Sequence, residues 1–255
     1  GDDAIITFTF SETVKNFSAS DVTVTGGKLK LFRQSDEEGR EFKATFVPEQ
    51  GTIGSAKISV STDWSDKLGN SAAAGDDLEL GSVNTIIPTA SVEILNDGTA
   101  LTANAVINKE MQSNLSVRVT FSDGLDANQN LNDFITVSGG TLGEFSPSDE
   151  GKVYTATFTP LSDAKAVAKV QVGTNWTAGG NAPINSVISP SIAVDTDVPS
   201  VNYSFGETTN FEVGETYTVS FTFSEIVTNF VIENLEIDPS FGSISNLQQT
   251  TDPRV

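Results

Sequence analysis

The chain repeats itself, and this repetition constrains its fold more than any other feature. The segment GDDAIITFTFSE at positions 1–12 aligns without a gap with GETYTVSFTFSE at positions 214–225, and a middle copy, SVRVTFSD, ends at Asp123. Further along, AKISVSTDW ends at Trp64 and AKVQVGTNW ends at Trp176. The period is about 111 residues, which is the size of one β-sandwich domain. The 255 residues therefore hold all or part of three repeats.

Alternation of apolar and polar residues within each copy predicts strands. Ile6, Phe8 and Phe10 alternate with threonines, which is the pattern of a half-buried strand. The matching positions of the other two copies keep this alternation. Clusters of Gly, Asn, Asp and Pro separate the short apolar runs, and no stretch has the pattern of an amphipathic helix. The prediction is an all-β fold of tandem β-sandwich domains.

Two similar linkers, NTIIP ending at Pro88 and DTDVP ending at Pro199, divide the chain. We predict a first repeat at 1–86, a second repeat at 87–196 and a third repeat at 197–255. By alignment, the first is expected to lack its opening strand and the second to be complete. The third is expected to be the N-terminal part of a repeat.

Charge and residue usage exclude several functions. The formal net charge is −20, from 34 acidic and 14 basic side chains, so nucleic acid and anionic membrane surfaces are not expected partners. The chain has no His and no Cys, which removes Ser-His-Asp and Cys-His catalysis, and we predict that it is not an enzyme. No apolar run is long enough for a membrane-spanning helix. The many carboxylates favour divalent cations, with Ca²⁺ as the expected cofactor.

The order of the motifs resembles a known family. FTFSE is followed by NFSASDVTVTGGKL, FKATFVP, a D-x-x-G-N stretch at 66–70 and a DTDVP linker. This order is similar to that of the bacterial Ig-like repeats of large biofilm-associated and RTX-type surface adhesins, and the resemblance covers essentially the whole chain. It implies Ig-like sandwiches arranged as beads on a string, outside the cell, on the bacterial surface or secreted. In that family Ca²⁺ at domain junctions commonly stiffens the string, and adhesive modules usually lie elsewhere.

Acidic residues gather where the second and third repeats are expected to meet. Asp195 and Asp197 lie in the linker, and Glu225 closes the second strand of the third repeat. A linker, a strand end and a loop together could supply the six to eight oxygens that Ca²⁺ needs. We therefore predict a Ca²⁺ site from these three residues. Glu12 and Asp66 form a second candidate pair at the matching positions of the first repeat.

A structural explanation of these acids stays open. Asp is an ordinary turn former, and a glutamate at a strand end is often only solvated. The linker of the first junction, at 84–87, has no carboxylate, so no strong Ca²⁺ site is expected there. We expect a hydrophobic contact through Ile86 and Ile87 instead.

The predicted function is that of a stalk or extender module of a long bacterial adhesin or filament. Its expected partners are neighbouring repeats of the same chain, together with lateral copies of itself or components of the cell surface or matrix. Two alternatives stay open, a glycan- or protein-binding module and an accessory domain array of a secreted enzyme. Exposed aromatic loops would favour the binding module, and the candidates are Phe32, Phe145, Tyr203 and Phe205. Trp64 and Trp176 share one repeat position, so we expect both to pack in the core.

Overall fold

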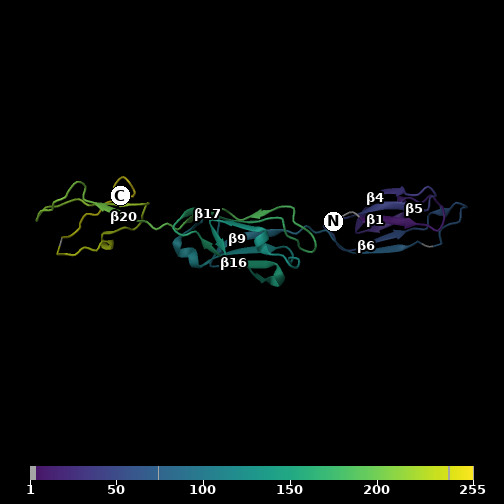
Figure 1. Ribbon diagram of the computed structural model, residues 1–255, viewed down its shortest axis with the longest axis horizontal. Helices are drawn as coiled ribbons and strands as arrows, with labels where there is room; N and C mark the ends of the chain where they lie inside the picture. Colours follow the sequence, from purple (N-terminus) through teal and green to yellow (C-terminus); the bar gives the residue numbers. More distant parts are fainter. Residues whose placement is uncertain (1–3, 74, 241, 255) are drawn as a thin grey trace.

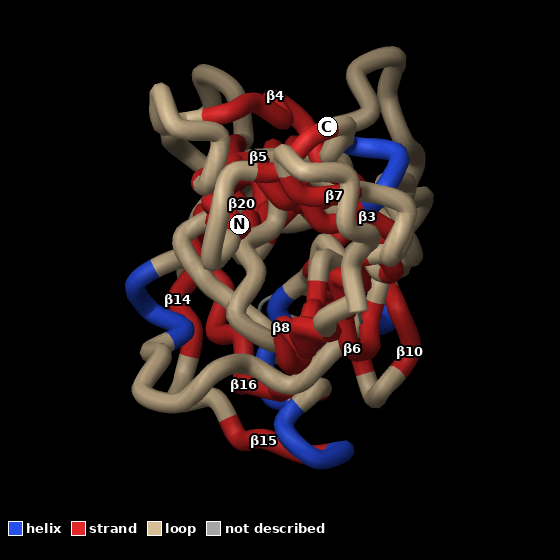
Figure 2. Tube along the Cα trace, turned by 90° about the vertical axis from the view of Figure 1, so that its right-hand side faces the viewer, coloured by secondary structure: helices blue, strands red, loops and turns tan. Residues whose placement is uncertain are grey.

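The structure, a computed structural model, describes residues 4–73, 75–240 and 242–254, so the first three residues of the opening motif lie outside the described part. Three units follow one another along a single long axis (Figure 1). Seen along this axis, they overlap in one narrow outline (Figure 2). The described elements are short strands with five 3-10 helices. None of the helices in these ranges is long and apolar enough to cross a membrane.

The first repeat is a sandwich of two three-stranded sheets. One sheet has the order β1 (Ala4–Thr9), β5 (Glu41–Pro48), β4 (Gly27–Gln34), and the other has the order β3 (Val22–Thr25), β6 (Ile53–Val60), β8 (Asp77–Asn84). A short pair, β2 (Val14–Lys15) with β7 (Ser65–Asp66), and the 3-10 helix η1 (Ala19–Asp21) lie between these strands in sequence. Ile6 and Phe8 are buried with Phe42 and Ile58, which confirms the predicted alternation.

The second repeat has the same plan with larger sheets. One sheet has the order β10 (Thr99–Ala100), β9 (Ala90–Asn96), β12 (Leu115–Phe121), β16 (Val153–Pro160), β14 (Gly140–Leu142), and β15 (Ser146–Ser148) also pairs with β16. The other has the order β11 (Val106–Ile107), β19 (Ile192–Asp195), β17 (Lys165–Val172), β13 (Ile135–Ser138), and β18 (Val187–Ile188) also pairs with β17. The 3-10 helices are η2 (Lys109–Ser113), η3 (Leu131–Asp133) and η4 (Asp149–Gly151).

The opening segment of the second repeat closes one side of its sandwich. β9 pairs with β12 in one sheet, and β11 then pairs in parallel with β19 in the other sheet. In the described part of the first repeat, β1 and β8 are edge strands at the matching places.

The third repeat begins in the same way as the second. Its strands β20 (Val201–Ser204) and β21 (Ser220–Phe223) pair antiparallel, and the 3-10 helix η5 (Ile232–Asn234) follows. Val201 lies opposite Phe223, just as Ala90 lies opposite Phe121 in the second repeat. The pairing register therefore repeats along the chain.

The two tryptophans are core residues. Trp176 is only 3% exposed and packs edge-on against Phe121, with 4.7 Å between the ring centroids. Trp64 packs in the same way against Phe10, at 4.8 Å. Each indole N–H donates to a main-chain carbonyl three residues earlier, at 2.9 Å. The predicted packing role of both tryptophans is confirmed.

Candidate functional site

The junctions between repeats are built on threonines that hold each linker to the repeat before it. Thr196 is fully buried; its hydroxyl donates to the Leu161 carbonyl at 2.7 Å and accepts from the Ala164 N–H at 3.2 Å. Thr85 lies at the matching place, where the Thr52 N–H donates to its hydroxyl at 2.9 Å. We call each of these contacts a threonine latch. The latch fixes the linker to a turn of the preceding repeat, between β5 and β6 in the first repeat and between β16 and β17 in the second.

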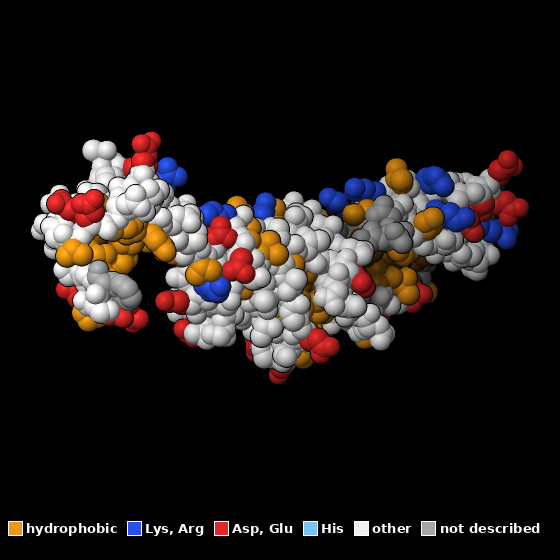
Figure 3. Space-filling model, turned by 60° about the vertical axis from the view of Figure 1, so that its left-hand side comes forward, with side chains coloured by type: hydrophobic (Ala, Val, Ile, Leu, Met, Phe, Trp, Pro, Cys, Tyr) orange, Lys and Arg blue, Asp and Glu red, His pale blue; other side chains and the backbone are white. Residues whose placement is uncertain are grey.

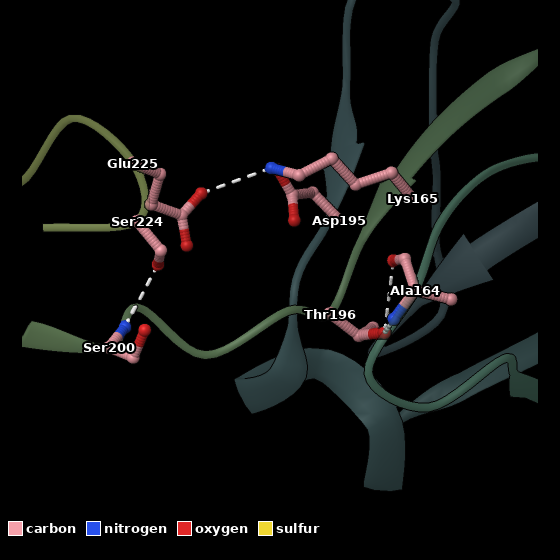
Figure 4. A network of polar contacts seen from close by, with 7 residues as sticks. All are labelled: Ala164, Lys165, Asp195, Thr196, Ser200, Ser224 and Glu225. Atoms are coloured by element: carbon pink, nitrogen blue, oxygen red, sulfur yellow. Dashed lines mark hydrogen bonds and ion pairs between the residues drawn. The ribbon is translucent and has the colours of Figure 1, made fainter.

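Serines hold each linker to the repeat that follows. The Thr89 N–H donates to Ser122 Oγ at 3.0 Å, and the Ser122 N–H donates back to the Thr89 carbonyl at 2.9 Å. Ser200 and Ser224 repeat this pair of hydrogen bonds at the second junction, both at 2.9 Å (Figure 4). We call each pair a serine latch. Three residues, the last of them proline, lie between the two latches of each linker.

At the second junction a lysine lies between carboxylates of two repeats. Lys165 begins β17, and its Nζ lies 2.7 Å from Asp195 Oδ2 and 3.0 Å from Glu225 Oε2 (Figure 4). The three side chains are partly exposed, at 56%, 37% and 28% respectively. Hydrogen bonds to Asp195 and then to Glu225 raise the pKa of Lys165, so the amine is charged at neutral pH.

The structure thus brings together two of the three residues predicted for Ca²⁺ at this junction. Asp197 is partly buried and, within the described ranges, makes no ion pair or side-chain hydrogen bond. Asp195 Oδ1 is buried without a hydrogen-bond partner in the described structure. Ca²⁺ needs six to eight oxygens, whereas nowhere among the described residues do three acidic side chains meet so that they could hold a metal ion. As arranged, these residues contact an ammonium group rather than form a Ca²⁺ cage, and calcium binding stays a prediction.

The second candidate pair, Glu12 and Asp66, is not joined in the described structure. Asp66 is 7% exposed, and its carboxylate accepts from the N–H groups of Leu68 at 2.8 Å and Asn70 at 2.7 Å and from the Asn70 side-chain amide. These hydrogen bonds, that of the Asn70 side chain first, lower the pKa of Asp66. Glu12 is exposed. Asp66 therefore organises its own loop.

Amide groups connect the first and second repeats. The Asn84 side chain donates to the Gly179 carbonyl at 3.2 Å, and the Asn181 side chain donates to the Asn84 carbonyl at 3.0 Å. Gly179 has a φ of +57°, and a Cβ there would lie 2.6 Å from the Asn84 amide nitrogen. The hydrophobic contact predicted through Ile86 is wrong, because Ile86 is 43% exposed; Ile87 is only partly buried. The described contacts across this junction are hydrogen bonds of short amide side chains.

Some of these residues were absent from the sequence-based prediction. A shared pattern, Asn or Asp followed by T-x-x-P, marks both threonine latches and could have identified them. Lys165 gives no such signal, because Ile53 lies at its place in the first repeat. Asp126 was also missed; its carboxylate accepts from the Gly180 N–H at 3.1 Å, and a hydrogen bond with Thr177 lowers its pKa. It holds the loop of the second repeat that corresponds to the Asp66 loop.

The candidate ligand-stacking aromatics fall into two groups. Phe32 and Phe145 pack against the cores of the first and second repeats. Tyr203 and Phe205 are 71% and 39% exposed. Phe205 belongs to an edge-to-face chain of rings with Phe211 and Tyr217, at 5.0 Å for each step. Hydrophobic side chains are accordingly visible on the surface of the third repeat (Figure 3).

A comparison with known protein families agrees with this architecture. The family model described as "Bacterial Ig-like domain" matches three successive segments, residues 1–81, 84–194 and 195–255. Among solved structures, InvD of Yersinia pseudotuberculosis is similar at 17% identity and a TM-score of 0.28, over 89% of this chain and 66% of that chain, slightly less than two thirds of its length. No curated protein matches. Because the three family matches span almost the whole sequence, the chain belongs to the bacterial Ig-like domain family.

Proposed function

We propose that this chain is an extender segment, a stalk that holds another module away from a bacterial cell as part of a long surface adhesin or filament. The observation that carries this proposal is the double latching of both linkers. A threonine ties each linker to the repeat before it, and a serine ties it to the repeat after it. Three intervening residues, one of them proline with its fixed φ, leave little freedom to bend.

The surface charge suits a long molecule exposed to solvent. A net charge of −20 keeps neighbouring copies apart, while each sandwich acts as a rigid segment. The partners that this role implies are the adjacent repeats of the same chain first, and lateral copies or matrix components second. The role is structural rather than catalytic.

Small-angle X-ray scattering of the whole chain tests the proposal. The wild-type chain is expected to give the long maximum dimension of an end-to-end arrangement. Inserting Gly-Gly-Ser after Ile86 and after Val198 separates the latches, so the scattering should then show a broader and more compact ensemble. A control insertion of the same length between Glu37 and Glu38, which are both exposed, should leave the dimension unchanged. If the linker insertions also leave it unchanged, the latched linkers do not set the shape and the proposal fails.

Calcium stiffening is a separate prediction, made for the junction between the second and third repeats. Thermal unfolding in millimolar Ca²⁺ and in excess EGTA tests it. A ligand that binds only the folded state adds about 3–4 kcal/mol at 100 to 1,000 times its Kd. If Asp195, Asp197 and Glu225 bind Ca²⁺, the melting temperature rises with Ca²⁺, and Asp197→Ala or Glu225→Ala abolishes the rise. An equal melting temperature in both buffers would show that calcium does not stabilise this junction. The proposal of a latched stalk would not be affected.

A further inference from the structure

The second junction joins two strongly acidic repeats. The third repeat has nine acidic residues and one basic residue, and the second has eleven and five, so their net charges are −8 and −6. Like net charges on adjacent domains repel. At the contact itself, Asp195 and Glu225 reach one ammonium group from the two repeats, and a cation between two carboxylates offsets their repulsion.

Lys165 supplies that cation from within the chain. Lys165 and Asp195 are direct partners in the β17–β19 pairing, so the sheet fixes their proximity. Glu225 follows Ser224, whose serine latch places the start of the third repeat beside this sheet edge. Among the ion pairs of the described residues, Lys165 with Glu225 is the one that joins two repeats; the others lie within one.

The first junction has neutral side chains at two of the three places; at the third, Asp123 lies where Glu225 lies at the second junction, 3.9 Å from Lys152 Nζ of its own repeat. Ile53 is the direct strand partner of Asn84, just as Lys165 is the partner of Asp195. The amides of Asn84 and Asn181 then cross this junction through hydrogen bonds whose donors and acceptors are uncharged. The two junctions therefore share latches but differ in the contact that crosses them.

We propose that Lys165 is the resident cation of the second junction. Its ammonium group joins Asp195 to Glu225 in the place where a metal ion would otherwise balance the two carboxylates. The proposal is thus the alternative to the Ca²⁺ site that the sequence predicts from the same carboxylates, and on it the junction closes without metal. Because all three side chains are partly exposed, dissolved ions screen the contact, whereas the amide contact of the first junction is insensitive to salt. This inference concerns the junction alone and does not depend on the role proposed for the whole chain.

Distance measurements between spin labels test the proposal on the full chain. The sequence has no cysteine, so Ser91→Cys and Ser220→Cys, both at exposed strand positions, place one label in the second repeat and one in the third. Lys165→Met should broaden the distance distribution, and K165E should broaden it further. The charge swap K165E/E225K should narrow it again. Lys109→Met is the matched control, because Lys109 makes an exposed ion pair with Asp163 at 3.1 Å within the second repeat.

The expected change in the undocked population, and its dependence on salt, follow from the exposure of the ion pair. An exposed ion pair shifts an equilibrium by roughly two- to five-fold, so Lys165→Met should raise the undocked population by about that factor. Raising the salt from 0.1 to 1 M shortens the Debye length from about 10 to about 3 Å. It should therefore broaden the wild-type distance distribution, as Lys165→Met does. EGTA should leave the wild-type distance distribution unchanged. Labels at Ser55→Cys and Ser91→Cys should show no salt response at the first junction.

Three outcomes would overturn the proposal. One is a Lys165→Met distribution equal to that of the wild type while Trp176 fluorescence shows a folded second repeat. Another is a failure of the charge swap to narrow the K165E distribution. The third is a wild-type distribution that broadens in EGTA and narrows again with Ca²⁺, which would assign the junction to a metal ion.

Discussion

Removing one hydroxyl group tests the threonine latch most directly. Thr196→Val keeps the shape of the side chain but deletes the donor to the Leu161 carbonyl and the acceptor for the Ala164 N–H, at 2.7 and 3.2 Å. A hydrogen bond contributes about 1 kcal/mol net, and a buried group left without its partner costs about 1–3 kcal/mol. Leu161 is exposed and Ala164 is partly buried, so water replaces part of the loss. The second repeat should lose about 1–2 kcal/mol of unfolding free energy.

Fluorescence can follow this repeat alone. The chain has two tryptophans, and Trp64 lies in the first repeat while Trp176 is buried in the second. In a Trp64→Phe background, the emission of Trp176 therefore reports the unfolding of the second repeat. A loss of 1–2 kcal/mol corresponds to a fall in Tm of roughly 4–16 °C for a domain of about 100 residues.

Two controls separate the hydroxyl from the packing. Thr196→Ser keeps the hydroxyl and loses the methyl group, so its Tm should lie nearer that of the wild type than that of Thr196→Val. Thr85→Val removes the matching latch of the first repeat and should leave the Trp176 transition in place. The reasoning is refuted if Thr196→Val unfolds at the wild-type midpoint, or if the serine variant loses as much stability as the valine variant.

Three further variants test other parts of the structure. Gly179→Ala puts a Cβ at a φ of +57° and 2.6 Å from the Asn84 amide, so spin labels on the first and second repeats should report a broader distance distribution, with the second junction unchanged. Asp66→Ala removes a carboxylate whose pKa is lowered in the folded state; its stabilisation is present above the ordinary value of 3.8 and is lost as the pH falls through the lowered pKa. Trp64 fluorescence of the wild type and the variant should therefore show unfolding midpoints that differ at pH 7 and converge in strong acid. Trp176→Ala leaves a cavity in the second core and should lower its stability by about 3–5 kcal/mol, measured by the circular dichroism melt.

The core of each repeat could be predicted because it depends on local alternation. Val117 and Val119 are fully buried, and Phe121 is 2% exposed, at positions that alternate with polar residues along one strand. Such a period of two specifies which face of the strand is buried, whatever the partner strands are. The internal repeat adds the tandem organisation, because the same strand motifs recur in the same order along the chain. Strand content and tandem organisation therefore followed from sequence alone.

The contacts at the junctions could not be predicted in this way, because they join residues distant in sequence. Lys165 is 30 residues from Asp195 and 60 from Glu225, and its counterpart in the first repeat is an isoleucine. Asp66 shows that one motif allows two interpretations, a ligand or a local turn. Its conspicuous D-x-x-G-N motif marks a carboxylate whose oxygens accept hydrogen bonds from its own loop. An acidic residue in a loop motif identifies a tight turn as readily as a ligand.

A comparison of the two junctions shows which contacts both linkers share and which contacts differ between them. Threonine and serine latches hold both linkers with the same kinds of donor and acceptor, a hydroxyl group and main-chain groups in each case. The contacts that cross the junctions differ: amide side chains donate to main-chain carbonyls at the first, and an ammonium group meets two carboxylates at the second. Because side chains can change without altering the strands, each junction can acquire its own response to salt or to cations. A tandem array of such repeats can thus combine one fold with junctions of different chemistry.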